Sequence, residues 1–488
     1  MNILFAVINP YDEHLAIMML SAVLKQNGHH VEVVQANVDK INNKLKQKHC
    51  GVIAYSPFTD DVEQYLAINR AIRKNYDCLS VFGGHHVSFD QGIIEDEHVD
   101  CLCIGEGEDA FIELIKKMEA GEPITNVPNF WVKRDCVVHK NALRPLRTDL
   151  DSLLFADRSL FKGSSSMRIM TGRGCIFDCT YCNNNSYSRL YGPQYKGIRR
   201  RSVNNVIKEI TTQIANNKKI SFIDFVDDMF IADIKWLEEF ADKYLQKIVI
   251  PFHCHVHPNC VNERVVKLLK QAGCKSVSMG IESGNADIRK NIFHRTMSND
   301  QIITAAKLIK ANGIGLETLN ICAIPGATIE QELETLHLNI QCKPDFSLCS
   351  LLGPYPGTFI REIIINGNHP VFYCSYSADA GKFTYGSKQK LYEMANFCML
   401  FPLVVKFPRL LPWTLSLMRW PGGWKLYGFC SVMLEWVTYH FIIFPPGRKG
   451  FWYEVKIYFE IISHILFSDK MGIWNYDYYN SKDACVIK

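Results

Sequence analysis

The stretch GRGCIFDCTYCNN, residues 172–184, decides the fold and the chemistry expected of this chain. It places Cys175, Cys179 and Cys182 in a C-x3-C-x2-C pattern, with the aromatic Tyr181 just before the third cysteine. Three thiolates this close can ligate three irons of one [4Fe-4S] cluster, whereas closed iron–sulfur and zinc sites mostly use four protein ligands. The fourth iron is then open to a substrate or cofactor. A chance grouping in a cysteine-rich chain is the alternative, and the position of the loop argues against it.

Composition narrows the class of protein. The chain has 488 residues, which predicts two or three domains, and 48% apolar against 21% charged residues indicates a globular core. A net charge of +4 is too small to favour a nucleic-acid partner. Eighteen cysteines without a recognisable signal peptide predict reduced thiols and a cytoplasmic location. The final CVIK outlines a prenylation box, but its terminal Lys is unusual and we treat it as chance.

Residues 1–125 alternate short apolar strands with amphipathic helices, which predicts a doubly wound, Rossmann-like parallel sheet. In such sheets the ligand binds beyond the carboxyl ends of the strands. Glycines at those ends let the backbone approach a large flat ligand closely. No G-x-G-x-x-G follows the first strand, so a dinucleotide is not expected. The segments at the strand ends are 9–14, 56–59, 83–90 and 105–109.

A second α/β domain is expected at residues 166–365, after a linker at 126–165 that includes an extended hairpin. Strands are predicted at 168–171, 220–226, 248–254, 276–281, 315–322 and 345–351, with helices between them. Six βα units predict a partial, open (β/α)6 barrel, and barrel enzymes place their chemistry at the carboxyl ends of the strands. The cysteine loop follows the first of these strands, as such a site requires.

Taken together, these motifs resemble one subgroup of the radical S-adenosylmethionine (SAM) enzymes. The cysteine loop, GGHHVSFD at 83–90, GEGE at 105–108 and MGIESGN at 279–285 occur in the order found in members with an N-terminal cobalamin-binding domain, the class B methyltransferase-like family. The resemblance covers residues 1–360 and implies three cofactors: a [4Fe-4S] cluster on the three cysteines, SAM on the open iron, and cobalamin on the first domain.

The resemblance also implies a set of SAM-binding residues. Arg295 could pair bidentately with the SAM carboxylate, or be an ordinary surface arginine. Asp227 and Asp228 either face SAM or substrate or cap the next helix, and Arg173 is expected to screen the charge of the cluster. In AIPGAT, at 323–328, the family's usual Gly-Glu-Thr reads Gly-Ala-Thr, which puts a polar role there in doubt. The implied SAM-binding residues are Tyr181, Glu282, Ser283, Gly284 and Arg295.

On the cobalamin side, the first helix carries a partial D-x-H-x-x-G signature, with Ile17 where glycine should be. His14 is therefore a cobalt-ligand candidate or a solvent-facing histidine, and Asp12 could equally be an N-cap. Gly83, Gly84 and His85 could likewise form only a strand-to-helix turn. The implied cobalamin-binding residues are Asp12, His14, Ser56, Gly83, Gly84, His85, Gly105, Glu106 and Gly107.

Residues 366–488 are expected to be mainly helical. Their cysteines, at 374, 398, 430 and 485, are scattered, so a second cluster is not expected. Charges and prolines interrupt each apolar run before about 18 residues, which argues against a transmembrane helix. Basic residues interleaved with tryptophans suit either a peripheral membrane contact or a helical lid on the barrel. They are Lys406, Arg409, Arg419, Lys425, Trp413, Trp420 and Trp424.

For function, the resemblance implies an enzyme that takes electrons from a flavodoxin- or ferredoxin-type donor and cleaves SAM reductively. With cobalamin, it implies methylation of an unactivated carbon or phosphorus of a small, hydrophobic metabolite. The first alternative is a radical cyclase or oxidase without methyl transfer. A non-catalytic corrin-binding module is an alternative of another class, and the intact cysteine loop argues against it. A methylthiotransferase is less expected, because Cys50, Cys78, Cys101 and Cys103 lack the spacing of a further cluster.

Overall fold

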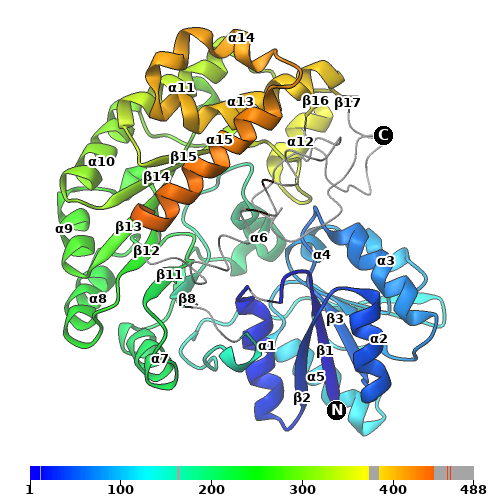
Figure 1. Ribbon diagram of the computed structural model, residues 1–488. Coiled ribbons are helices and arrows are strands. Elements are labelled where there is room, and N and C mark those ends of the chain that lie inside the picture. Colours follow the sequence, from blue (N-terminus) through cyan, green and yellow to red (C-terminus); the bar gives the residue numbers. More distant parts are fainter. Residues whose placement is uncertain (11, 162–164, 373–383, 444–458, 460–461, 463–488) are drawn as a thin grey trace.

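The computed structural model describes residues 1–10, 12–161, 165–372 and 384–443, together with residues 459 and 462. Figure 1 shows an N-terminal α/β domain (blue to cyan) beside a second α/β domain (green), whose upper part is covered by C-terminal helices (orange). The C-terminal CVIK and the cysteines at 374 and 485 lie outside the described residues. Both α/β domains agree with the fold class expected from the sequence.

The first sheet is doubly wound. Its parallel strands follow the order β2-β1-β3-β4-β5, and β6 and β7 extend it as an antiparallel hairpin, so this sheet continues past residue 125. Successive residues of β1 point to opposite faces, so Ile3 and Phe5 join one apolar core while Leu4 and Ala6 join the other. The strands are β1 (Asn2–Val7), β2 (His30–Gln35), β3 (Val52–Tyr55), β4 (Leu79–Phe82), β5 (Cys101–Cys103), β6 (Phe130–Arg134) and β7 (Val137–Lys140). The helices are α1 (Leu15–Gln26), α2 (Val38–Gln47), α3 (Val62–Arg73), α4 (His85–Phe89) and α5 (Glu108–Ala120).

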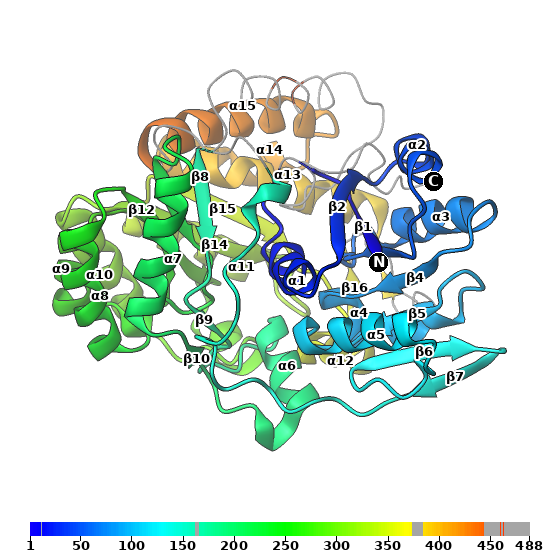
Figure 2. The ribbon, with the colours of Figure 1, turned by 90° about the horizontal axis from the view of Figure 1, so that it is seen from below.

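The second sheet is fully parallel and follows the sequence, in the order β15-β14-β13-β12-β11-β8. Its first and last strands are not neighbours, so the described strands form an open, partial (β/α)6 barrel. They are β8 (Ser166–Ile169), β11 (Phe222–Phe225), β12 (Phe252–Val256), β13 (Cys274–Glu282), β14 (Gly315–Cys322) and β15 (Phe346–Leu351). Helices α7 (Val203–Asn216), α8 (Ile234–Lys247), α9 (Glu263–Gln271), α10 (Asn299–Ala311) and α11 (Ile329–Cys342) cover its outer face (Figures 1 and 2).

The barrel helices begin where the sequence supplies N-caps. Ser298 and Thr328 form capping boxes with Gln301 and Gln331, which satisfy backbone N–H groups that a helix start leaves unpaired. Asp233 caps α8 by accepting bonds from the backbone N–H groups of the first turn. These local signals determine where α8, α10 and α11 begin.

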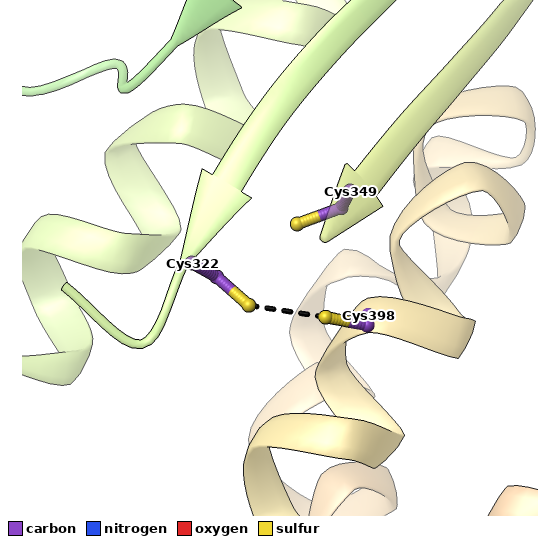
Figure 3. A group of neighbouring side chains, drawn as sticks. All are labelled: Cys322, Cys349 and Cys398. Carbon is purple, nitrogen blue, oxygen red and sulfur yellow. Dashed lines mark hydrogen bonds between the residues drawn. The ribbon is translucent and has the colours of Figure 1, made fainter. Parts of the chain in front are cut away.

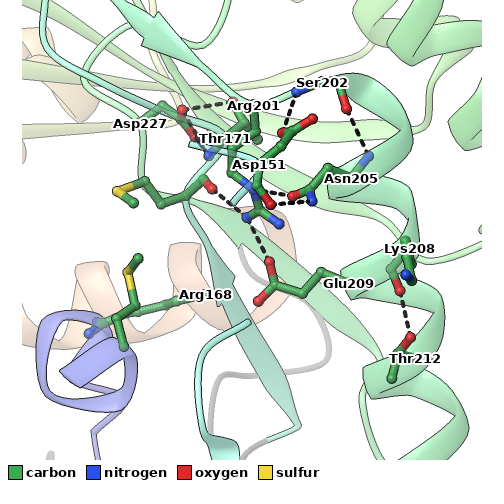
Figure 4. A network of polar contacts seen from close by, with 12 residues as sticks. Asp151, Arg168, Thr171, Arg201, Ser202, Asn205, Lys208, Glu209, Thr212 and Asp227 are labelled. Atoms are coloured by element: carbon green, nitrogen blue, oxygen red, sulfur yellow. Dashed lines mark hydrogen bonds and ion pairs between the residues drawn. The ribbon is translucent and has the colours of Figure 1, made fainter. Parts of the chain in front are cut away.

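A buried arginine fixes α7 against the first barrel strand (Figure 4). Arg201 donates to the carbonyl of Met170 at 2.9 Å, to Asn205 Oδ1 at 2.7 Å and to Glu209 Oε2 at 2.6 Å. Asp151 of the linker accepts a bond from the N–H of Ser202 at 2.8 Å, so the linker is held to the same helix start. Because a buried charge is costly unless paired, these contacts fix the position of the chain that leads into the cysteine loop.

The C-terminal region is helical, as expected, and it packs on the edge of the second sheet. α13 packs on β15, α15 packs on α13, and the π-helical turn that continues α15, Tyr439–Ile443, contacts β13 and β14. The helices are α12 (Phe359–Asn366), α13 (Lys388–Lys406), α14 (Thr414–Met418) and α15 (Gly423–Thr438), and a short pair of strands, β16 (Pro370–Val371) and β17 (Thr384–Tyr385), lies beside them.

One apolar helix here is longer than the sequence patterning predicted. The helix Gly423–Ile443 has 21 residues with a hydropathy of 1.3, which by length and composition alone is enough to cross a membrane. The sequence predicted that charges and prolines would interrupt the apolar run, and they do not. Residues 423–443 contain no proline, and Lys425 and Glu435 do not break the helix. A core helix passes the same test, and this helix packs on α13 and the barrel.

Candidate functional site

The cysteine loop lies between β9 (Gly172–Arg173) and α6 (Asn183–Tyr191). Gly174 has a φ of +95°, and a Cβ there would lie 2.5 Å from the carbonyl oxygen of Gly197, so the turn requires glycine. The N–H of Cys175 donates to the Tyr195 hydroxyl at 2.8 Å, which fixes the start of the loop. The N–H of Phe177 lies 3.4 Å from Cys175 Sγ. Hydrogen bonds to cysteine sulfurs tune iron–sulfur clusters, so the loop fits one.

Three of the predicted SAM-binding residues gather beside Cys179. Arg295, on the loop after β13, lies 3.5 Å from Cys179 Sγ and 3.2 Å from the Tyr181 hydroxyl, and it donates to the carbonyl of Gly280 at 2.6 Å. Its Nε is buried and has no hydrogen-bond partner among the described residues. Glu282, with a φ of +68°, lies against Arg295, and burial raises the pKa of its carboxyl despite that positive charge. A buried cation with a spare donor beside the cysteines fits a carboxylate ligand such as that of SAM.

Ser283 and Gly284, which directly follow Glu282, contact other parts of the barrel. The Ser283 carbonyl accepts a bond from Arg289 Nη1 at 2.7 Å, and the N–H of Gly284 donates to Thr335 Oγ1 at 2.9 Å. A Cβ at Gly284 would lie 2.2 Å from the carbonyl oxygen of Glu334, so this backbone packs directly on α11. The contacts that the structure gives these two residues therefore serve packing.

The paired aspartates at the end of β11 have separate roles. Asp227 is buried and accepts bonds from the N–H of Thr171, at 3.0 Å, and from its hydroxyl, at 2.7 Å. Burial raises the pKa of Asp227, which Arg200 partly offsets. Asp228 is open to the cavity described below, and burial inside the protein likewise raises its pKa. Neither aspartate caps α8, since Asp233 does so.

A cavity of about 1110 Å³ lies between the two α/β domains. Cys182, Asn184 and Asp228 line it from the barrel side, and Tyr187 and Tyr191 of α6 line it in between. All nine residues predicted to bind cobalamin line it as well: Asp12, His14, Ser56, Gly83, Gly84, His85, Gly105, Glu106 and Gly107. The structure thus brings the strand ends of the first domain and the cysteine loop to one chamber.

Two glycines of this chamber permit close packing that a side chain would block. Gly84 has a φ of +93°, and a Cβ there would lie 2.7 Å from Ser56 Oγ. Gly105 has a φ of +76°, and a Cβ there would lie 2.0 Å from the Tyr191 hydroxyl, which accepts a bond from the N–H of Glu106 at 3.2 Å. The helix after the cysteine loop is therefore seated on the first domain's glycine turn. Both turns line the cavity at the carboxyl ends of the strands, where a doubly wound sheet binds its ligand.

Arg173, just before the cysteine loop, forms ion pairs that bridge the two domains. Its guanidinium lies 2.9 Å from Glu106 and 2.5 Å from Glu108, and Arg199 lies 2.6 Å from Glu106. Burial would raise the pKa of Glu106, but Arg199 and Arg173 hold it below its usual value. Glu106, predicted as a cobalamin contact, is thus a charged anchor of the domain interface.

Two histidines face the chamber from the first domain. His14 is half-buried, its Nε2 lies 3.2 Å from the carbonyl oxygen of Asn9, and its ring packs on Phe161. Asp12 accepts a bond from Asn9 Nδ2 at 2.9 Å. His85 packs edge-on against Tyr187, and the loss of solvent around its ring lowers its pKa. His85 can present a ring nitrogen to a ligand.

The sequence reading missed a polar cluster inside the barrel. Glu317 of β14 accepts bonds from the hydroxyls of Ser278 and Tyr439, and His253 Nε2 lies 3.0 Å from Ser278 Oγ. These residues and His255 line the same cavity. The signal was present, because polar residues at every second position of FHCHV and KSVS point to one face of the sheet. Glu435 and Trp436 of α15 also line the cavity, so the C-terminal region forms part of its wall.

Comparisons with known proteins agree with this architecture. A family model described as the radical SAM superfamily matches residues 169–338, and one described as a B12 binding domain matches residues 1–115. An uncharacterized methyltransferase of Pyrococcus horikoshii is 27% identical over 372 residues, 72% of this chain and 79% of that protein. The anaerobic magnesium-protoporphyrin IX monomethyl ester cyclase of Cereibacter sphaeroides is 22% identical over 369 residues, 70% of this chain and 58% of that protein.

A solved structure has the same fold. That of the radical S-adenosylmethionine methyltransferase TsrM from Kitasatospora setae, with tryptophan and a SAM analogue bound, covers 75% of this chain and 76% of its own chain. Its sequence is 17% identical and its TM-score is 0.63, a likeness of fold alone.

Proposed function

Because this chain is a cobalamin-dependent radical SAM enzyme, with a B12-binding domain before its radical SAM domain, we propose that it methylates a carbon or phosphorus atom of a small, largely apolar metabolite. The observation that carries the proposal is the single cavity lined both by Cys182 and by the glycine turns of the first domain. Methyl transfer requires the two cofactors and the substrate to meet, and this chamber is open to all three.

The chain's own residues have distinct roles in this proposal. Cys175, Cys179 and Cys182 hold the cluster, Arg295 faces the SAM carboxylate, and the turns at Gly84 and Gly105 hold the corrin. When bound, SAM at the cluster supplies a radical able to abstract hydrogen from an unactivated carbon, and cobalamin supplies the methyl group. The protein then has to orient the substrate and exclude water, which the enclosing wall of α6 and α15 favours.

The lining of the cavity supports an apolar substrate with a polar handle. Phe58, Leu319, Leu348 and Trp436 contribute apolar surface, while the Glu317 carboxylate is held by two hydroxyls. Pockets of this kind bind by apolar contact and orient the ligand through a few polar groups. A tetrapyrrole-like or other ring-rich metabolite fits this description, and the cyclase relative is named for a porphyrin ester.

A cyclase or oxidase reaction without methyl transfer is the second candidate, favoured by the similarity to that cyclase. The two differ in their co-products, because methyl transfer from SAM leaves S-adenosylhomocysteine while hydrogen abstraction leaves 5′-deoxyadenosine. The test incubates the reconstituted enzyme, a reductant and SAM carrying a deuterated methyl group with a metabolite extract. Methyl transfer predicts a deuterium-labelled product and both co-products. If 5′-deoxyadenosine forms in the presence of substrate, but no product carries deuterium and no S-adenosylhomocysteine is found, the reaction belongs to the cyclase or oxidase class.

A flavodoxin- or ferredoxin-type protein is proposed as the electron donor.

The C-terminal region is proposed to contact a membrane surface. Exposed Trp413 and Trp420 lie among exposed Lys406, Arg409 and Arg419, a combination suited to a membrane interface. The double variant Trp413→Ser and Trp420→Ser should bind anionic phosphatidylglycerol vesicles less than the wild type. Val249→Ser, which removes an exposed apolar side chain from the barrel, is the control. If the wild-type protein does not bind the vesicles, the proposed membrane contact is wrong.

A further inference from the structure

Three cysteines from distant parts of the sequence meet at the edge of the second sheet (Figure 3). Cys322 ends β14, Cys349 lies in β15, and Cys398 lies in the middle of α13. Their sulfur atoms all lie within 4.8 Å of one another, and those of Cys322 and Cys398 are 3.1 Å apart. Within the part of the chain that the structure describes, no other three histidine, cysteine or acidic side chains converge in this way.

The spacing of the three sulfurs suits one metal ion. Zinc binds thiolates at about 2.3 Å, so two sulfurs on a tetrahedral zinc lie about 3.8 Å apart. The Cys322–Cys398 separation of 3.1 Å is somewhat shorter than that value, and no pair of the three sulfurs is more than 4.8 Å apart. Thiolates of a four-iron cluster each bind a different iron and are therefore spread farther apart. The group thus favours a single ion over a second iron–sulfur cluster.

A buried carboxylate beside the sulfurs points to a cation independently. Glu332 of α11 is 2% exposed, and its Oε1 accepts a bond from the N–H of Ile324, two residues after Cys322, at 2.9 Å. Its Oε2 has no hydrogen-bond partner among the described residues. Its electrostatic interaction with Cys349 and Cys398 places the carboxylate close to the sulfurs. A buried carboxylate oxygen without a partner is costly, and a bound cation removes that cost.

We propose that Cys322, Cys349 and Cys398 bind one zinc ion, with the buried Glu332 carboxylate near the site. The ion joins α13 to the carboxyl ends of β14 and β15 and so fastens the C-terminal region to the barrel. The three ligands come from two strands and a helix that already pack together, so the site needs only the loss of the thiol protons on binding. This site is separate from the cysteine loop and does not depend on the reaction proposed above.

The test measures zinc in the full-length protein as purified, before any iron or sulfide is added. We expect about one zinc per chain in the wild type, as in structural thiolate sites, and a loss of most of it in Cys398→Ser and Cys349→Ser. Cys430 is a partly buried cysteine of α15 outside the group. The variant Cys430→Ser is therefore the matched control, and this protein should keep its bound zinc. The variant with alanine at residues 175, 179 and 182 should lose iron on reconstitution but keep zinc.

A second measurement covers variants that do not fold. The variant with alanine at residues 175, 179 and 182, stripped of zinc by a chelator, is titrated with Co²⁺, and equimolar uptake with a thiolate-to-cobalt charge-transfer band supports the site. Two results overturn the proposal: equal zinc in the wild type and Cys398→Ser, or a zinc-free wild type in which peptide mapping finds a Cys322–Cys398 disulfide.

Discussion

At the scale of single residues, Arg295 connects the cysteine loop with the carboxyl end of β13. It is 6% exposed and contacts Cys179, Tyr181 and the Gly280 carbonyl at once. The sequence indicated this residue through its place after MGIESGN. It did not show that Glu282 lies against Arg295 while Gly284 packs on α11, because neighbours in a turn can face opposite sides.

We expect Arg295→Lys to lower reductive cleavage of SAM by about ten- to a hundredfold, the loss that follows when a charge-assisted hydrogen bond is removed. A lysine keeps the charge but not the planar pair of donors. The measurement is 5′-deoxyadenosine formed under dithionite, in protein with equal iron content. Arg289 is a fully buried neighbour that contacts α10 and not the cysteine loop. Arg289→Lys should therefore lower stability more than it lowers SAM cleavage. Wild-type cleavage by Arg295→Lys would remove this residue from the SAM site.

His86 provides a test of pH dependence. It is 2% exposed beside Thr59, and burial lowers its pKa to about 4, with Arg361 also lowering it and Asp90 opposing. Between its unfolded pKa near 6.5 and this value, the unfolded chain binds a proton that the folded chain does not, so stability falls as the pH falls.

The stability advantage of the wild type over His86→Asn should therefore shrink by about 2–3 kcal/mol from pH 7 to pH 4.5. Urea unfolding of both proteins at several pH values measures it. Parallel stability curves would show that His86 titrates alike in both states.

At the scale of elements, predictions succeeded where local patterns determine structure. The strand predicted at 315–322 is observed with the same bounds, Gly315–Cys322. The meeting of Cys322 with Cys398 could not be predicted, since the two are 76 residues apart in sequence and only the packing of α13 on β15 joins them. The length of the apolar helix Gly423–Ile443 differs from the prediction, because the single charges Lys425 and Glu435 do not interrupt it.

The glycine turn after β5 allows a matched test. Gly105→Ala introduces a Cβ that would lie 2.0 Å from the Tyr191 hydroxyl, whereas Gly121→Ala, at a similar φ of +68°, meets no described atom within 4 Å. Both carry the strain of a positive φ, about 1 kcal/mol, but only the first displaces α6 from the cavity wall. We expect Gly105→Ala to lose most bound cobalt and Gly121→Ala to keep it. Equal cobalt in the two variants would contradict the role given to this turn.

At the scale of the whole molecule, the cavity depends on how the two domains are held together. The ion pairs of Arg173 and Arg199 with Glu106 and Glu108 cross the interface and are mostly buried. Glu106→Gln leaves both arginines without that charge, so the free energy of unfolding should fall by about 2 kcal/mol. Glu113→Gln, which breaks an ion pair with Arg144 inside the first domain, should cost less than about 1 kcal/mol. If Glu106→Gln and Glu113→Gln lowered the free energy of urea unfolding equally, the ion pairs of Glu106 would not stabilise the domain interface.

The central claim is that one chain holds a radical SAM cluster and cobalamin at a shared cavity. The most direct measurement reconstitutes the protein anaerobically with iron, sulfide and hydroxocobalamin, removes what is unbound, and counts iron and cobalt. We predict about four irons and one cobalt per chain. The variant with alanine at residues 175, 179 and 182 should keep cobalt and lose iron. A wild type that binds iron but no cobalt would contradict the account.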